Sequence, residues 1–129
     1  MIPTKKKRQH SEDDTCIEFV KIVQTFQNLT SNKFVFFHIP NEISANNNPI
    51  FGAKLKRMGK LAGVPDYCFL WNKSVGFIEF KAKKGVLSEA QKTFKENMEN
   101  LDIKFAIAYT SNDGVYILKE WGLLTNINI

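Results

Sequence analysis

The stretch GVPDYCFLWNKSVGFIEFKAKKG, residues 63–85, predicts two apolar strands joined by a tight turn. The turn falls at residues 72–74, where Asn, Lys and Ser interrupt the apolar run. Three charged residues, Asp66, Glu79 and Lys81, stand in strand positions that buried sheets normally fill with Val, Ile or Leu. Two carboxylates and an ammonium group in such strands require a specific reason.

The geometry of a hairpin supplies one such reason. Side chains alternate faces along a strand, so Glu79 and Lys81 share one face of the strand predicted at residues 75–82. With the turn centred near residues 72–73, Asp66 falls opposite Glu79 or one position from it. Directly opposed residues have Cβ atoms about 5 Å apart, and two carboxylates at that separation repel each other. A proton, a nearby cation or a metal ion must offset this repulsion, and hard oxygen ligands suit Mg²⁺.

Ordinary structural roles remain open for each charged residue taken alone. A Glu-x-Lys sequence on a strand is common on a solvated face, and an Asp after a Pro is common at a turn or a strand start. Pro65 itself fits the first residue of a strand, where proline is tolerated. The pairing of Asp66 with Glu79 at hairpin spacing is a stronger sign of a functional site than either residue alone, and it becomes persuasive only together with the segments around it.

The spacing of apolar residues predicts eight elements along the chain. Their order, α-β-(α)-β-β-α-β-α, places the chain in the α/β class, with a mixed β-sheet flanked by helices. The elements are expected at residues 12–29, 33–39, 51–63 (a short basic helix ending near Gly59), 64–71, 75–82, 88–101 and 103–110, with a last helix capped by Asn112 or Asp113 and running to residue 121.

Length and composition indicate one intracellular domain. The 129 residues suit a single domain at residues 11–129, preceded by a flexible basic arm at residues 1–10. The formal net charge of +5 permits a polyanionic partner without requiring one. Cys16 and Cys68 stand beside apolar neighbours, which favours reduced thiols in a cytoplasmic protein. We find no membrane span, no secretory signal, no Gly-rich phosphate loop and no zinc-ligand spacing, so no membrane and no small-molecule cofactor are expected.

Basic residues gather in three short clusters that are candidates for contact with nucleic acid. The run KLKRMGK, residues 54–60, precedes the hairpin and contains no acidic residue. Lysine and arginine contribute sequence-independent affinity for phosphates, although a solvated helix or loop face explains the same run. The run KKKR, residues 5–8, is open to interpretation as a nucleic-acid contact, a nuclear address or a tail without a role. The candidate contact residues are Lys54, Lys56, Arg57, Lys60, Lys83 and Lys84.

Three segments in succession carry a resemblance to a known family: GVPD at residues 63–66, IEFK at 78–81 and LSEAQ at 87–91. This combination resembles the PD-(D/E)xK nuclease superfamily and, more closely, the VRR-Nuc family of virus-type replication-repair nucleases. The resemblance extends from about residue 14 to residue 121, and the segment HIPNE at residues 38–42 also matches small phage-type members. No Val-Arg-Arg tripeptide is present, but small members often lack it.

The resemblance implies a restriction-endonuclease-like fold and cleavage of DNA phosphodiesters with Mg²⁺ or Mn²⁺. By this resemblance, Asp66 and Glu79 bind the metal ion, and the backbone carbonyl of Phe80 is a further ligand. Lys81 matches the catalytic lysine of the family. Glu18 matches the glutamate of the first helix, which reaches toward the metal region. Gln91 matches a glutamine that supports the catalytic cluster and orients the lysine.

Local patterns leave other roles open for the last two residues. Glu18 lies at the margin of the apolar stripe of its predicted helix, where an ordinary boundary residue is also expected. Gln91 follows Ser88 by three positions, which is the spacing of a capping box. Because one side chain cannot easily fill both roles, we expect capping by Gln91 to compete with service at the site.

The resemblance implies a DNA endonuclease acting on branched or structured DNA, such as a four-way junction, in replication, recombination or repair. Cleaving both strands with one site per chain requires two subunits, so a homodimer is expected. Two alternatives stay open: a catalytically silent nucleic-acid-binding module of a larger complex, and a nuclease directed at RNA. A phage- or virus-encoded origin fits the resemblance, and a nuclear location would follow if residues 5–8 are an address.

Overall fold

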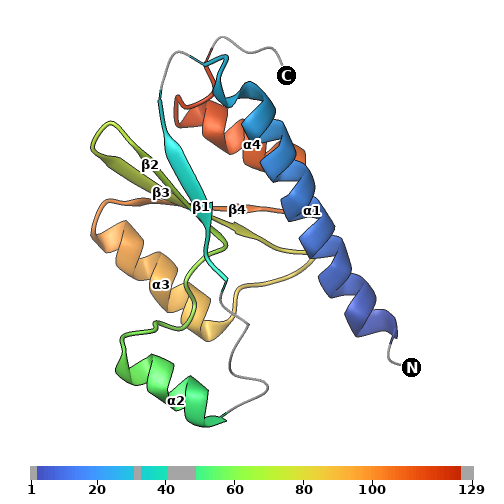
Figure 1. Ribbon diagram of the computed structural model, residues 1–129, viewed down its shortest axis with the longest axis vertical. Coiled ribbons are helices and arrows are strands. Elements are labelled where there is room, and N and C mark those ends of the chain that lie inside the picture. Colours follow the sequence, from blue (N-terminus) through green and yellow to red (C-terminus); the bar gives the residue numbers. More distant parts are fainter. Residues whose placement is uncertain (1–2, 31–32, 41–48, 126–129) are drawn as a thin grey trace.

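The computed structural model describes residues 3–30, 33–40 and 49–125, with side chains described from residue 12 onward. Within these ranges, helices and strands follow the predicted order, and the expected mixed sheet flanked by helices is confirmed (Figure 1). The elements are α1 (Pro3–Gln27), β1 (Val35–His38), α2 (Pro49–Arg57), β2 (Tyr67–Trp71), β3 (Ser74–Phe80), α3 (Glu89–Asn100), β4 (Lys104–Ala108) and α4 (Ser111–Glu120).

The sheet has the order β1-β2-β3-β4, with two antiparallel pairs followed by a parallel pair between β3 and β4. The crossover between the two parallel strands is α3. The β2–β3 hairpin pairs Tyr67 with Ile78 and turns at Asn72 and Lys73. Both turn residues have positive φ values, 37° and 65°, as two-residue hairpin loops require. The predicted turn and register of this hairpin are confirmed.

Helices cover both faces of the sheet, with α1 and α4 together on one face and α3 on the other (Figure 1). Phe19 of α1 packs against Phe69 and Phe80, with ring centroids 6.1 and 4.9 Å apart. On the opposite face, Phe94 of α3 packs against Phe77 with a centroid distance of 5.2 Å. Because residues of β3 alternate between these layers, the odd-numbered positions face α3.

The helix α2 lies apart from the sheet, near one end of α3 (Figure 1). It has no buried residue, and Ile50 in its first turn is 82% exposed. Its position therefore depends little on a hydrophobic core, unlike that of the other three helices.

Three helix starts differ from the predictions, and α2 begins at Pro49, two residues before its predicted start. The helix α1 begins at Pro3 rather than near residue 12, so it includes residues 3–10 that were assigned to the arm. Proline is accepted in the first turn of a helix because its missing N–H needs no partner there. The cap of α4 is Thr110 rather than Asn112 or Asp113. Thr110 Oγ1 accepts the backbone N–H of Asp113, and the Asp113 carboxylate accepts the backbone N–H of Thr110, at 3.0 and 3.1 Å.

Candidate active site

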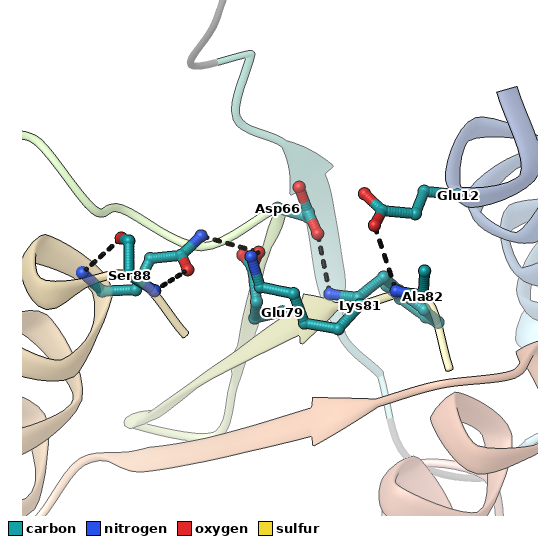
Figure 2. A network of polar contacts seen from close by, with 8 residues as sticks. Glu12, Asp66, Glu79, Lys81, Ala82 and Ser88 are labelled. Carbon is teal, nitrogen blue, oxygen red and sulfur yellow. Dashed lines mark hydrogen bonds and ion pairs between the residues drawn. The ribbon is translucent and has the colours of Figure 1, made fainter. Parts of the chain in front are cut away.

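The open end of the β2–β3 hairpin brings Asp66 and Glu79 together. Tyr67 pairs with Ile78, and one step further along the same register Asp66 lies beside Glu79. Asp66 Oδ2 accepts a hydrogen bond from the backbone N–H of Phe80 at 2.7 Å (Figure 2). The carboxylate of Asp66 is therefore held against the strand that carries Glu79.

Glu79 is the centre of a polar cluster in an otherwise apolar sheet. It is 5% exposed, and its Oε2 accepts a hydrogen bond from Gln91 Nε2 at 2.9 Å. The same oxygen lies 3.7 Å from Nζ of Lys81, whose side chain is 19% exposed. The structure thus assembles Asp66, Glu79 and Lys81 at one end of β3, with Gln91 of α3 beside them.

Electrostatics at Glu79 reflect its burial and its acidic neighbours. Burial raises the pKa of Glu79 to about 8, and the negative charges of Asp66 and Glu12 push it in the same direction. The ammonium group of Lys81 and a backbone hydrogen bond from Asp66 lower this pKa but do not reverse the shift. Without a further cation, Glu79 therefore holds a proton at neutral pH.

Gln91 makes the two kinds of contact that its sequence position left in competition. Its Oε1 accepts the backbone N–H of Ser88 at 2.8 Å, and Ser88 Oγ accepts the backbone N–H of Gln91 at 3.2 Å. This is a complete capping box at the start of α3. Its Nε2 still donates to Glu79. The expectation that capping the helix and contacting the cluster exclude each other is wrong, because the Oε1 atom of Gln91 makes the capping contact while its Nε2 atom donates to Glu79.

The acid that α1 brings to the cluster is Glu12 rather than Glu18. Glu12 Oε2 accepts the backbone N–H of Ala82 at 3.0 Å, just beyond the end of β3. Glu18 accepts a hydrogen bond from the Ser111 hydroxyl of α4 at 2.9 Å. Figure 2 shows Glu12 on one side of the cluster and Ser88 on the other. The structure thus does not bring Glu18 into the cluster around Glu79.

The sequence held a signal for Glu12 that the reading of the first helix missed. Glu12 precedes Phe19 by seven positions and Val23 by eleven, and at about 100° per residue these three positions share one face. Phe19 and Val23 are both fully buried. The helix was expected to begin near residue 12, and the buried stripe of Phe19 and Val23 was therefore not traced back as far as Glu12.

A family model described as VRR-NUC domain matches residues 12–112, most of the chain. The match begins at Glu12 and contains Asp66, Glu79, Lys81 and Gln91. The chain belongs to the VRR-NUC family. No curated protein and no solved structure matches it. VRR-NUC membership implies a nuclease of the PD-(D/E)xK type, and it confirms the resemblance found in the sequence.

The donor set of this VRR-NUC cluster suits a hard divalent cation. Positive charge beside Asp66 and Glu79 offsets the repulsion and burial that raise the Glu79 pKa. Among side chains from residue 12 onward that the structure describes, no group of three or more His, Cys, Asp or Glu residues is placed to hold an ion by itself. An ion at this cluster would need water and substrate oxygens as well, which is the usual coordination of Mg²⁺ in proteins.

The candidate nucleic-acid contacts of the VRR-NUC domain separate into different surfaces. Lys56 and Lys60 line a hollow of about 550 Å³ that also reaches Gln91. Lys54 and Arg57, both on α2, do not line that hollow and are exposed. A second hollow, of about 390 Å³, is lined by Lys81. The remaining candidates, Lys83 and Lys84, are exposed in the turn that follows β3.

The two cysteines and His38 contact neighbouring groups of the fold or are shielded by them. Burial raises the pKa of the Cys16 thiol to about 12, and burial likewise raises the pKa of its neighbour Tyr67. Cys68 is a buried free thiol. His38 Nδ1 lies 3.0 Å from the backbone oxygen of Asp66, whereas Asn41 and Glu42 of the matching segment lie outside the described residues. In the ranges that the structure describes, no helix has the length and apolarity to cross a bilayer.

Proposed function

We propose that this VRR-NUC protein is a divalent-metal-dependent DNA endonuclease that hydrolyses phosphodiester bonds. The observation that carries the proposal is the juxtaposition of Asp66 and Glu79, with the Lys81 ammonium 3.7 Å from the Glu79 carboxylate. A buried acid with a raised pKa beside a second acid and a lysine is a typical arrangement of a functional site. The family match supports nuclease chemistry at this cluster.

The residues that would hold the ion are Asp66, Glu79 and the backbone carbonyl of Phe80. Glu12 takes the part that the sequence assigned to Glu18, because it is the acid of α1 whose charge acts on Glu79. When bound, Mg²⁺ or Mn²⁺ polarises the scissile phosphate and lowers the pKa of a bound water.

The side chains around the carboxylates perform the remaining tasks. The Lys81 ammonium, 3.7 Å from the Glu79 carboxylate, would stabilise the negative charge that develops on the phosphate oxygens. Gln91 donates to the same Glu79 oxygen that Lys81 approaches, so it fixes the orientation of that carboxylate. Its other contacts, to Ser88, anchor the amide to the first turn of α3. Gln91 is thus a positioning residue that acts through Glu79.

The choice of DNA, its branched form and the oligomeric state complete the proposal. The family match supports a nucleic-acid substrate. We take branched DNA as the preferred form and a homodimer as the active state, because one site per chain cuts one strand at a time. A nuclease that acts on RNA through the same cluster is the second candidate.

The test is incubation of the purified protein with linear duplex, nicked and four-way DNA and with RNA, in Mg²⁺, Mn²⁺ or EDTA. We expect cleavage of DNA with either ion and none in EDTA. Lys81→Ala should retain DNA binding in a gel-shift assay and lose cleavage by about 100-fold or more, since it removes a charge that stabilises the transition state. Lys104→Ala, at an exposed lysine at the start of β4, is the matched control and should cut normally.

Three results would count against the proposal. DNA binding without cleavage under any ion indicates a silent binding module. Cleavage of RNA alone indicates the second candidate. Normal cleavage by Lys81→Ala removes the assigned role of that lysine.

A further inference from the structure

A hollow of about 550 Å³ lies between α2 and the first turn of α3, beside the catalytic cluster but not part of it. Its volume falls in the range of small-ligand pockets, about 300–1,000 Å³. Small residues form much of its wall, and two lysines supply its charge. The lining residues used below are Ala53, Lys56, Lys60, Gly63, Ser88 and Gln91.

The hollow is joined to the catalytic cluster through one side chain. Gln91 lines it and also donates from Nε2 to Glu79 Oε2 at 2.9 Å. Only the side-chain amide of Gln91 therefore separates a group bound in the hollow from the proposed position of the scissile phosphate. A nucleic-acid strand bound at the cluster would place one of its nucleotides in this hollow.

The wall between the hollow and α3 depends on close approach of two backbones. Gly63 has φ +83°, and a Cβ at that position would lie 2.3 Å from the carbonyl oxygen of Ala90. Only glycine permits this contact, which sets the loop directly against the first turn of α3. This side of the hollow is therefore built into the backbone before any substrate binds.

The charge of the hollow is one-sided. Residues 49–65 contain Lys54, Lys56, Arg57 and Lys60 and no acidic residue. Lys56 and Lys60 line the hollow, and Ala53 and Gly63 present apolar and backbone surface beside them. A ligand that fits both the lysines and the apolar surface needs a flat apolar group and an anionic group. A nucleotide has both, in its base and its phosphate.

We propose that this hollow holds a nucleotide next to the scissile phosphate, with its base turned out of the stack and its phosphate near Lys56 and Lys60. The inference rests on the proposed function and names a feature of its substrate. A base paired in duplex must be unstacked to enter such a hollow, at a cost of a few kcal/mol that is least for a mismatched or single-stranded base. The hollow therefore selects strands that are unpaired beside the cut.

The test compares variants that alter the hollow with variants that alter only charge. Ala53→Leu fills the hollow and keeps the helix propensity of α2 high. Lys56→Ala/Lys60→Ala removes two charges that line the hollow, whereas Lys54→Ala/Arg57→Ala removes two nearby charges that do not. Fluorescence anisotropy with a labelled 12-nucleotide single strand and the matching blunt duplex, in Ca²⁺, measures binding, and circular dichroism confirms that each variant is folded.

We expect Ala53→Leu to weaken single-strand binding roughly fivefold or more, the lower end for loss of one base contact, and to leave duplex binding unchanged. Lys56→Ala/Lys60→Ala should reduce the salt slope for the single strand by about 1.4, at about 0.7 per phosphate contact. Lys54→Ala/Arg57→Ala, which removes two candidate contacts outside the hollow, should reduce this slope by less than Lys56→Ala/Lys60→Ala does. An abasic nucleotide scanned along the strand should weaken wild-type binding at one position and add nothing to Ala53→Leu.

Several results would overturn the inference. The first is an Ala53→Leu variant that binds the single strand as tightly as the wild type does. The second is an Ala53→Leu variant that loses the same affinity for single strand and for duplex. The third is an equal change of the salt slope in the two double variants. A change of oligomeric state in Ala53→Leu without loss of single-strand affinity would assign the hollow to a second copy of the chain and overturn it too. Cleavage in Mg²⁺ separates this inference from the proposed function. If the wild type binds as expected but cuts no nucleic acid, the nuclease proposal fails and the hollow stands. If it cuts while Ala53→Leu binds normally, only the hollow fails.

Discussion

Glu79 is buried in the sheet while the carboxylates of Asp66 and Glu12 act on it. An ionised acid in such a position is unfavourable unless a cation or several hydrogen-bond donors compensate it. Lys81 and Gln91 provide part of this compensation through the same carboxylate oxygen. The raised pKa shows that they do not complete it. A proton on Glu79 or a further cation beside it would offset the remaining cost of burying this acid.

The raised pKa of Glu79 predicts how stability of the metal-free protein depends on pH. Between about 4.5 and about 8 the folded protein holds a proton that the unfolded chain has lost. The free energy of unfolding should therefore fall as pH rises through this window, by an amount on the order of a few kcal/mol. Urea unfolding in EDTA at pH 5, 6, 7 and 8 measures the slope. Glu79→Gln should flatten it, and equal slopes in both proteins would contradict the shift.

The charged residues of the hairpin were predictable because their relation is local. Alternation of side chains and the position of a two-residue turn were sufficient to place Asp66 beside Glu79 and Lys81 on the same face as Glu79. The register from the structure agrees with this expectation. Gln91 required more than spacing, since its contact with Glu79 depends on how α3 packs against the sheet.

At the scale of elements, the two ends of Gln91 connect the start of α3 to β3. Gln91→Glu retains a carboxylate oxygen for the capping box but loses the donor to Glu79. We expect this variant to lose most cleavage activity, by about 10- to 100-fold as for outer-shell partners of metal ligands. Ser88→Ala removes the cap side chain and should lower the free energy of unfolding by about 1 kcal/mol while cleavage continues. Thermal unfolding and initial cleavage rates in Mg²⁺ measure both effects. Loss of activity in Ser88→Ala equal to that in Gln91→Glu would mean that positioning by the cap, rather than the contact to Glu79, matters.

The two acids of α1 allow a matched comparison. Glu12 and Glu18 are six positions apart, which is about 9 Å along a helix axis. Glu12→Gln should reduce Mg²⁺-dependent cleavage by roughly 10- to 100-fold, because its charge acts on Glu79. Glu18→Gln should leave cleavage near the wild-type rate, because its partner is the Ser111 hydroxyl. Cleavage rates across a Mg²⁺ titration measure this. The reverse order of effects would restore Glu18 to the site.

The helix boundaries explain why the sequence pointed to Glu18 rather than to Glu12, whose carboxylate accepts the backbone N–H of Ala82. The reading from sequence began this helix at residue 12, so Glu12 was its first residue and was not recognised as part of the apolar stripe that it continues. The structure extends α1 to Pro3. A helix that long projects past the core, so its first turns carry no apolar periodicity to reveal it.

At the scale of the whole molecule, the order of elements was predictable and the placement of α2 was not. The order followed from periodicity and from turn residues, which are local. The helix α2 buries no residue, so no apolar stripe in the sequence indicates where it packs. The hollow between α2 and α3 exists only in the folded chain. The candidate site therefore combines a part that local patterns encode, the hairpin, with contacts that tertiary packing supplies, those of Glu12 and Gln91.

The packing of α1 and α4 over the sheet gives a test of the molecule as a unit. A Cβ on Gly114 of α4 would lie 2.6 Å from the ring of Phe19 and 2.9 Å from that of Phe80. Both rings are almost fully buried, with 0% and 2% of their surfaces exposed. Ala is the better helix former by about 1 kcal/mol, but overpacking of a filled core typically costs about 1–3 kcal/mol.

We expect Gly114→Ala to lower the free energy of unfolding, because the rings of Phe19 and Phe80 have no room to retreat. It should also reduce cleavage. Phe80 precedes Lys81 and donates its backbone N–H to Asp66, so a displaced Phe80 ring disturbs the strand that carries the cluster. Chemical denaturation and cleavage rates measure both effects, with Asn112→Ala, an exposed position on the same helix, as the control. A stabilised Gly114→Ala protein would show that helix propensity outweighs the contact, and that α1 and α4 are less closely packed than the distances indicate.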